Sequence, residues 1–196
     1  MSSKWDKKYL NSVSPNEPCA VLSDNLHLLP ANGSSMDVAC GLGGNALLLA
    51  QLGFESYACD SSAVALEKLG VFAQQQKLRV NCELKDFEVG ELSGGVFELK
   101  FDVIVVSHYL YRPLMPWLVE GLNVGGLLFF QTFSQNKLSD SGPGNPEYLL
   151  QPQELLSEFA ELDLRYYKDD DRAGVDSPDG SGVDRDRVYY VGQKKG

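Results

Sequence analysis

The stretch MDVACGLGGNA, residues 36–46, decides the fold of this chain. Its apolar start predicts a buried strand, and its end opens a helix over residues 46–52. Gly41, Gly43 and Gly44 lie between the two and carry no Cβ, so the backbone can turn tightly and approach another molecule closely. The first N–H groups of the helix have no partner inside it and face the same place. The alternative is an ordinary strand-to-helix turn whose glycines serve packing alone.

A second apolar strand, expected over residues 55–59, ends at Asp60. An acidic residue roughly 20 positions after such glycines is placed to accept hydrogen bonds from ribose hydroxyls. The turn, the helix, the strand and the terminal acid together predict a site for a nucleotide-type cofactor. Asp60 could instead cap the following helix, although Ser61 or Ser62 could fill that role.

Composition limits the classes of partner. The chain has 17 basic and 27 acidic residues and a net charge of −10. Nucleic-acid binders and proteins on anionic membranes carry basic surfaces, so we expect neither a nucleic-acid nor a membrane partner. No apolar run reaches the roughly 18–20 residues that span a bilayer, and residues 1–12 lack the apolar core of a secretory signal. We therefore expect a cytoplasmic location.

The four cysteines show neither C-x-x-C pairs nor metal-type spacing. Cys40, Cys59 and Cys82 fall in or beside expected strands, so we expect buried free thiols rather than disulfides or ligands. The aspartate-rich stretch 169–186 lacks the ligand order of an EF-hand, with its Gly at the sixth place. We expect a solvated turn there and no metal site.

Strands and helices alternate along the chain, which predicts a parallel sheet with helices on both faces. The last two strands have only a polar loop between them, and strands joined in this way are usually antiparallel. We therefore expect an α/β fold: a Rossmann-like, doubly wound, seven-stranded, mostly parallel sheet with one antiparallel strand near the C-terminal edge. The expected strands are 35–39, 55–59, 79–84, 101–106, 127–133, 164–168 and 187–192, and the expected helices are 3–10, 20–29, 46–52, 62–77, 113–122 and 152–162.

The length predicts a single domain over residues 1–196. Within it we expect an N-terminal helical cap, residues 1–33, and an α/β core, residues 34–196. Residues 134–150 follow the fifth strand and are rich in glycine and proline. A loop of this length and composition at the end of a strand is suited to cover a site, so we expect a lid there.

With these motifs in these positions, the chain resembles the class I S-adenosylmethionine-dependent methyltransferases, in particular the small bacterial tellurite-resistance and thiopurine methyltransferase-like group. The resemblance covers nearly the whole chain. It rests on residues 36–45, on the Trp-Asp…Tyr segment at 5–9 and on the segment 145–150. One departure is Ala39, which stands where the family has its first glycine and puts the tightest backbone approach to the cofactor in question.

The resemblance implies S-adenosylmethionine (SAM) as cofactor and S-adenosylhomocysteine (SAH) as product. It places Asp37 near the methionine ammonium, Asp60 on the ribose, and Asp86 with Phe87 at the adenine edge. Asp37 could instead orient the turn, and Phe87 could belong to the core. The full expected cofactor set is Trp5, Tyr9, Asp37, Ala39, Cys40, Gly41, Gly43, Asn45, Asp60, Ser61, Asp86, Phe87 and Ser107.

The expected reaction is methyl transfer to a small-molecule acceptor by in-line displacement at a sulfonium. Soft anionic acceptors need mainly positioning and exclusion of water, whereas oxygen or nitrogen acceptors need a base. His108, after a buried strand, is the candidate base, and a structural role is its alternative. Arg112 could grip an anionic acceptor or be a solvated arginine at a helix start. The expected acceptor-binding residues are Tyr109, Tyr111, Arg112 and Tyr148, in a monomer or homodimer.

Two other functions fit parts of the sequence. The spacing Gly41-x-Gly43-x-x-Ala46 also satisfies the dinucleotide pattern of NAD-dependent oxidoreductases, with Asp60 on the ribose. Against that reading, an acid at position 37 would repel a pyrophosphate, and the last strand pair lacks a connecting helix. The third possibility is a non-catalytic domain that binds SAM or SAH, because a fold alone does not establish a reaction.

Overall fold

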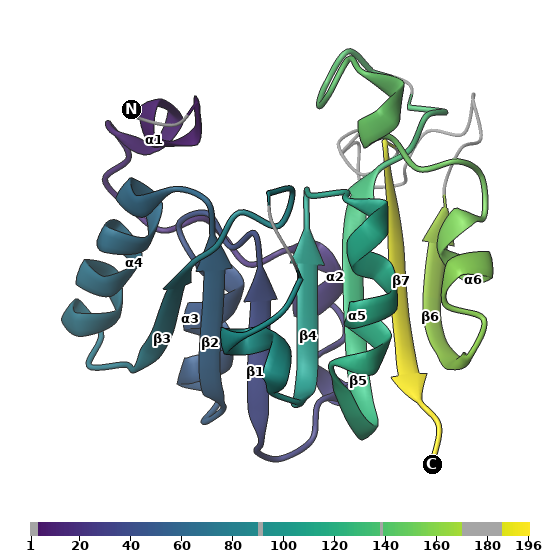
Figure 1. Ribbon diagram of the computed structural model, residues 1–196, viewed down its shortest axis with the longest axis horizontal. Coiled ribbons are helices and arrows are strands. Elements are labelled where there is room, and N and C mark those ends of the chain that lie inside the picture. The colour runs from purple at the N-terminus through teal and green to yellow at the C-terminus, as the bar shows by residue number, and fades with distance from the viewer. Residues whose placement is uncertain (1–3, 90–91, 138, 170–185) are drawn as a thin grey trace.

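The computed structural model describes residues 4–89, 92–137, 139–169 and 186–196. Its centre is one seven-stranded sheet in the order β3-β2-β1-β4-β5-β7-β6 (Figure 1). The strands are β1 (Ser34–Val38), β2 (Glu55–Asp60), β3 (Val80–Leu84), β4 (Phe101–Ser107), β5 (Leu122–Phe133), β6 (Leu162–Asp169) and β7 (Arg187–Lys194).

One strand of the sheet is reversed. The pairs β1–β2, β1–β4, β2–β3 and β4–β5 are parallel. Strand β7 lies between β5 and β6 and is antiparallel to both. This arrangement confirms the expected Rossmann-like fold with one antiparallel strand near the C-terminal edge. It follows from the sequence, because no helix separates β6 from β7 to return the chain to the opposite end of the sheet.

Helices cover both faces of the sheet, so it is doubly wound (Figure 1). Helices α2, α3 and α4 pack on one face, and α5 and α6 pack on the other. The helices are α1 (Lys4–Tyr9), α2 (Ala20–Ser23), α3 (Gly44–Gln51), α4 (Ala63–Gln75), α5 (Met115–Glu120) and α6 (Glu154–Glu158), with short 3-10 turns η1 (Leu26–Leu28), η2 (Gly95–Glu98), η3 (Arg112–Leu114) and η4 (Pro146–Tyr148).

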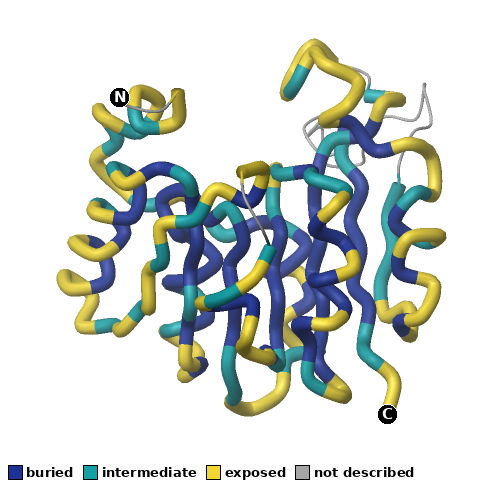
Figure 2. The backbone as a smooth tube through the Cα atoms, in the orientation of Figure 1, coloured by how far each residue is buried: buried dark blue, intermediate teal, exposed yellow. Residues whose placement is uncertain are grey.

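Strand β4, in the middle of the sheet, is buried on both faces. Val103 and Val105 of β4 belong to the apolar cluster under α2 and α3, whereas Ile104 and Val106 belong to the cluster under α5 and α6. Figure 2 shows this as dark blue along the middle of the sheet. Continuous apolar runs are typical of strands covered on both sides, which is why the sequence predicts this part of the fold well.

Three expectations about local structure are wrong. The helix expected over 20–29 stops at Ser23, where the side chain of Asn25 donates to the carbonyl oxygen of Val21 (2.9 Å). The helix expected over 152–162 covers only Glu154–Glu158, because Gln153 has a left-handed φ of 60° and starts it late. Cys82 is exposed rather than buried, since β3 is an edge strand with an open face.

Two segments lie at the edge of the sheet where the parallel strands end. Helix α1 lies beside the start of α4, and the segment that holds η4 lies above β5 and β7 (Figure 1). Between them are the ends of β1, β2 and β4. The residues that the sequence singles out for cofactor binding are therefore flanked by one segment from each half of the chain.

Candidate functional site

The expected cofactor residues meet at the carboxyl ends of β1, β2 and β4, which are neighbours in the sheet. Connections from β1 and β4 leave in opposite directions along the sheet, and ligands of open α/β sheets bind at such a switch point. The glycine turn follows β1, Asp60 ends β2, and Ser107 ends β4. The structure therefore brings the three expected parts of the site together.

Asp60 is fastened to the glycine turn. Its Oδ2 accepts from the backbone N–H of Gly41 (2.8 Å) and its Oδ1 from the N–H of Ser62 (2.8 Å). The side chain is 6 % exposed, and burial raises its pKa above the ordinary value. Ser62, not Asp60 or Ser61, caps α4 by accepting from the N–H of Ala65 (3.2 Å). Asp60 is therefore not the cap of α4, and its carboxylate lies at the glycine turn. Its contact with a ribose stays a prediction.

Asp37 is fully buried, and its carboxylate oxygens accept hydrogen bonds from groups of the chain itself. Its carboxylate accepts from Asn45 Nδ2 (3.1 Å) and from the backbone N–H of Ala46 (3.2 Å). Burial raises the pKa of Asp37 to about 7, and these two hydrogen bonds oppose that shift. In the structure Asp37 therefore orients the turn, which was the alternative role. Its contact with a ligand ammonium stays a prediction.

Asn45 links three parts of the site. Its Nδ2 also donates to Ser107 Oγ (3.1 Å), and its Oδ1 accepts from the backbone N–H of Cys19 (2.8 Å). Both amide hydrogens and the amide oxygen are therefore used within the chain, so Asn45 and Ser107 position the strand ends. The contact to Cys19 could not be expected from the motif, because it comes from a segment far away in sequence.

The N-terminal segment lies directly on the glycine turn. A Cβ added to Gly41 would stand 2.8 Å from the Tyr9 hydroxyl, and one added to Gly44 would stand 2.8 Å from the carbonyl oxygen of Glu17. The glycines therefore allow close approach, as expected, but part of that approach is by the chain itself. Sequence reasoning missed Asn16 and Glu17, since nothing in their pattern marks them as neighbours of a turn almost 30 residues later.

Helix α1 is held in place by α4. The Asp6 carboxylate accepts from Ser62 Oγ (2.7 Å), and Lys68 Nζ donates to the carbonyl oxygens of Leu10 (2.7 Å) and Ser12 (2.6 Å). Burial, together with the nearby Asp60 and Cys40, raises the pKa of Tyr9 to about 12. Tyr9 consequently keeps its proton and can donate a hydrogen bond at the turn.

Trp5 lies at the periphery of this cap. Its ring stacks on that of Tyr9 with the centroids 6.4 Å apart, and Lys8 Nζ lies 4.7 Å from the Trp5 ring centroid. The Trp5 side chain is 42 % exposed. Of the two expected aromatic residues, Tyr9 is therefore at the turn, and Trp5 supports it from outside.

Ala39 and His108 share an unusual backbone conformation. Their φ angles are 52° and 56°, in the left-handed region that glycine adopts most easily. Ala39 thus takes a conformation that favours glycine, the residue that the resemblance places there. Cys40, beside it, is buried and donates its N–H to the carbonyl oxygen of Cys59 (2.9 Å), which ties the turn to β2.

His108 begins the segment after β4. Its backbone N–H donates to the carbonyl oxygen of Gln131 (2.8 Å), and its ring centroid lies 5.8 Å from that of Phe133. His108 is exposed, yet the desolvation that its neighbours cause, with the charges of Arg187 and Lys8, lowers its pKa to about 4. The imidazole is therefore neutral at pH 7, as a base must be, but only weakly basic.

The expected adenine-edge pair is divided between surface and core. Asp86 is exposed, and its Oδ1 accepts from the N–H of Glu88 (3.0 Å). Phe87 is 3 % exposed and lies nearly perpendicular to Phe97, with 5.9 Å between the ring centroids. The core role of Phe87 is thus seen directly. Tyr109 lies next to it, 6.2 Å between centroids, and burial raises the Tyr109 pKa.

Arg112 has a partner that the sequence did not suggest. Its guanidinium pairs with Glu154, with Nε 2.6 Å from Oε1. Arg112 is at the start of η3 with its side chain 40 % exposed, as in the alternative of a solvated arginine, but its guanidinium is paired. Tyr111 packs against the core beside it, and Tyr148 is 44 % exposed on η4. Acceptor contacts by these residues stay predictions.

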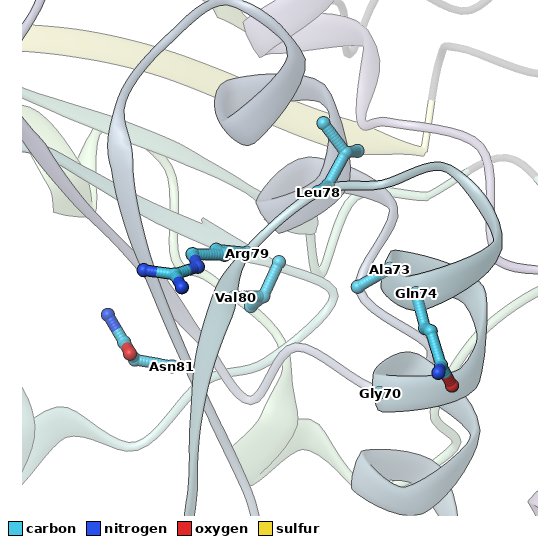
Figure 3. Close-up of a pocket in the computed structure, with 7 residues that line it drawn as sticks. All are labelled: Gly70, Ala73, Gln74, Leu78, Arg79, Val80 and Asn81. Atoms are coloured by element: carbon cyan, nitrogen blue, oxygen red, sulfur yellow. The ribbon is translucent and has the colours of Figure 1, made fainter.

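The one surface hollow drawn in Figure 3 is not this site. It has a volume of about 410 Å³ and lies between the end of α4 and the start of β3, at the opposite edge of the sheet. Its lining residues are Gly70, Ala73, Gln74, Leu78, Arg79, Val80 and Asn81.

The described ranges contain neither a cluster of metal-ligating side chains nor a membrane-spanning helix. Within residues 4–89, 92–137, 139–169 and 186–196, no cluster of three or more His, Cys, Asp or Glu side chains could hold a metal ion. In the same part of the chain, no helix has the length and apolar character to cross a bilayer.

No protein-family model and no curated protein sequence matches the chain. Solved structures do match its fold. TehB from Haemophilus influenzae superposes with a TM-score of 0.70 at 17 % identity, over 97 % of this chain and 66 % of that one. An S-adenosylmethionine-dependent methyltransferase from Mesorhizobium loti gives a TM-score of 0.65 at 16 % identity, over 89 % and 98 %.

A third similar structure is the [4+2]-cyclase SpnF, with a TM-score of 0.62 at 16 % identity over 89 % of this chain and 78 % of that one. The chain spans slightly less than two thirds of the TehB chain. Likeness at these identities establishes architecture, and the sheet order with its reversed β7 agrees with it. The chain therefore has the fold of the S-adenosylmethionine-dependent methyltransferases.

Proposed function

We propose that this protein is a SAM-dependent methyltransferase that acts on a small-molecule acceptor. The observation that carries the proposal is the sheet order 3-2-1-4-5-7-6 with β7 reversed, above which the glycine turn and Asp60 meet. A dinucleotide-binding sheet has the order 3-2-1-4-5-6 and no reversed strand in it. The architecture therefore favours SAM over NAD, although the glycine spacing fits both.

The residues around the turn fit an adenosyl cofactor. Asp60 offers carboxylate oxygens beside the turn, and Tyr9 offers a hydroxyl above Gly41. The Asp37 carboxylate lies below the turn, where an ammonium would be stabilised by charge. Bound SAM would supply a methyl group on a sulfonium, which is already an activated leaving group. The tasks left to the chain are to orient the acceptor, exclude water and, for an acceptor that must lose a proton, accept that proton.

His108 is the residue proposed for that proton. It is neutral at pH 7 and follows β4 at the site, next to Tyr109. A pKa of about 4 makes it a weak base, so the geometry fits best an acceptor that is already anionic or needs little help to lose its proton. The proposal includes the rest of the sequence-based expectation: one domain, a cytoplasmic location, and a monomer or homodimer.

Calorimetric titration with SAH and with NADH tests the proposal. In the titration we expect SAH to bind and NADH not to bind. In a thermal melt, SAH should raise the melting temperature of the protein and NADH should not, because a ligand stabilises the folded state that it binds. Asp60→Ala should weaken SAH binding by about 1.5–3 kcal/mol, the usual cost of losing a hydrogen-bonded charge. Asp163→Ala, the same change in an exposed residue of β6, is the matched control and should bind like the wild type.

The outcomes separate the three candidate functions. Binding of NADH without SAH would replace the proposal with an oxidoreductase. Binding of SAH without methyl transfer to any acceptor in a screen with labelled SAM would favour the non-catalytic domain. An unchanged dissociation constant in Asp60→Ala would remove Asp60 from the site.

A further inference from the structure

The side chain of Arg112 binds three residues, Glu147, Leu149 and Glu154, that lie 35 to 42 positions later in the sequence. Its Nε and Nη2 donate to the two carboxylate oxygens of Glu154 (2.6 and 3.0 Å). Its Nη1 donates to the carbonyl oxygen of Glu147 (2.7 Å), and Nη2 also donates to that of Leu149 (3.1 Å). Four of the five N–H donors of the guanidinium are thus used within the chain. An acceptor anion could bind Arg112 through two N–H groups only by displacing at least one of these partners.

Glu154 is fixed from the other side. Its side chain is 10 % exposed, and Oε2 also accepts from the backbone N–H of Gln151 (2.8 Å). A bidentate pair between a guanidinium and a carboxylate is geometrically specific and stronger than a neutral hydrogen bond. The pair therefore defines where η3, which starts at Arg112, stands relative to α6, which starts at Glu154.

The two carbonyl groups that Arg112 holds belong to residues 145–150, which we call the closing segment. The last residue of the closing segment, Leu150, is bonded to the end of β5. The N–H of Gln135 donates to the carbonyl oxygen of Leu150 (2.9 Å), and the N–H of Leu150 donates to the carbonyl oxygen of Phe133 (2.9 Å). Those bonds fix its base. Arg112 fixes the part beyond the base, which carries Tyr148.

Arg112 itself belongs to the segment that follows β4 at the candidate site. Residues 108–112 run from the end of β4 directly to η3, and they include Tyr109 and Tyr111. We propose that Arg112 and Glu154 are a positioning pair, which holds the closing segment against residues 108–112 and so sets the entrance to the site. Arg112 then acts through the closing segment and not by touching the acceptor. The effect on ligand exchange rests on the proposed function, whereas the effect on the closing segment does not.

Hydrogen exchange by mass spectrometry tests the structural half. In Arg112→Gln and in Glu154→Gln, peptides covering 145–151 should exchange about tenfold faster, because local opening no longer breaks a charge-assisted pair. Peptides from β5 should keep their wild-type rates. Arg165→Gln is the matched control: it removes the same charge from an exposed arginine of β6 bonded to Gln193, and it should leave 145–151 unchanged.

The double variant decides whether the two residues act as one. Arg112→Gln with Glu154→Gln should exchange no faster than Arg112→Gln alone, since the pair is already broken there and partners in one interaction are not additive. The exchange rate of Arg112→Lys should lie between those of the wild type and Arg112→Gln, because a single ammonium keeps the charge but cannot reproduce the two-point contact of the guanidinium with the carboxylate. Wild-type exchange in Arg112→Gln, or a double variant in which the two single effects multiply, would overturn the proposal. If Arg112→Gln does not fold, the lysine variant and Glu154→Gln give the same decision.

The dissociation rate of SAH tests the functional half. We expect release to be about fivefold faster in both single variants with no such change in Arg165→Gln, as for a cover that opens more often. Faster exchange with unchanged release would show that the closing segment does not control the entrance. If the wild type does not bind SAH at all, the proposed function fails, and the exchange measurements still decide whether the pair holds the segment.

Discussion

At the scale of single residues, the two strand ends at the centre of the site share a strained backbone. Ala39 after β1 and His108 after β4 both have a left-handed φ, and these strands are neighbours in the sheet. Such a conformation costs an L-residue roughly 1–2 kcal/mol and is kept only where its surroundings impose it. At both positions the chain must turn at once above a buried strand.

Ala39→Gly should therefore stabilise the protein. Glycine adopts this φ without a Cβ clash, and after its greater loss of entropy we expect a net gain of about 0.5–1 kcal/mol in the free energy of unfolding. Urea denaturation measures it. Ala50→Gly, in α3 where the backbone is helical, is the control and should destabilise by about 0.5–1 kcal/mol. A loss of stability in Ala39→Gly would mean that the Ala39 methyl group has packing that outweighs the strain.

His108 should remain neutral well below physiological pH. Its pKa is lowered to about 4, so the unfolded chain takes up a proton near the ordinary pKa of 6.5 while the folded chain does not. The contribution of His108 to stability is therefore lost as the pH falls from about 6.5 to about 4. The imidazole proton resonances, assigned with His27→Gln, measure it. Titration near pH 6.5 would contradict the described surroundings.

Residue patterns predicted where the candidate site residues lie in the fold better than which groups they contact. The sequence identified the turn, Asp37 and Asp60, because a strand end is fixed by its own apolar run. It did not show that Asn45 uses all its hydrogen-bonding groups, or that Arg112 faces Glu154. Those partners come from distant segments, and the local pattern of polar residues contains no information on which of them meet.

At the scale of elements, the first turn of α4 connects the core to the N-terminal helix. Ser62 caps α4 through its Oγ, and the same hydroxyl donates to the Asp6 carboxylate. Asp6 Oδ1 also accepts from the N–H of Val64 (3.4 Å), so an acid of α1 lies at the positive end of α4. One hydroxyl thus serves two helices.

Ser62→Ala should affect both helices at once. Loss of the cap should lower the free energy of unfolding by about 1 kcal/mol. Because Asp6 also loses its hydroxyl partner, amide exchange in α1 should become faster, which mass spectrometry detects. Ser61→Ala, one residue earlier and not the cap, should change neither quantity. Equal effects of the two substitutions would show that the capping hydroxyl is unimportant.

Short helices were the elements least predictable from sequence. Residues 20–29 have helical apolar spacing, but the helix ends after one turn, and Asn25, buried, bonds back to the Val21 carbonyl oxygen. Asparagine competes with the helix by such side-chain bonds, and tertiary burial decides the outcome. Conversely, α4 has a cap and a regular apolar stripe, and its expected start agrees with the structure.

At the scale of the whole molecule, stability depends on a sheet covered on both sides. Phe129 and Phe130 are neighbours on β5 but point into different clusters, one under α2 and one under α5. Phe130 is 2 % exposed and packs with Phe159, at 6.0 Å between ring centroids. The two layers therefore share one central strand.

Phe130→Ala should cost about 3–5 kcal/mol in the free energy of unfolding, since it removes a large buried side chain and leaves a cavity. Denaturation in urea, followed by circular dichroism, measures it. Val124→Ala on the same strand is the control: Val124 is 72 % exposed, and its loss should stay within about 0.5 kcal/mol. A cost below about 1 kcal/mol for Phe130 would mean that the layer under α5 collapses into the space.

The architecture as a whole was predictable because its strands are long apolar runs in an alternating order. The reversed β7 could be inferred from one missing helix, and the structure bears this out. What the order of elements could not give is how segments outside the sheet are laid over it. The position of residues 9–17 on the glycine turn depends on tertiary contacts with α4, which no periodicity encodes.

The fastening of the N-terminal segment has a consequence for biosynthesis. Residues 4–19 are synthesised before the segments that fasten them, which are the glycine turn, the start of α3 and α4 from its cap Ser62 as far as Lys68. During translation this stretch therefore cannot pack on its partners until the first two strands and α4 have left the ribosome and folded. A chaperone that holds emerging chains would find it accessible in that interval and lose it once α4 has formed.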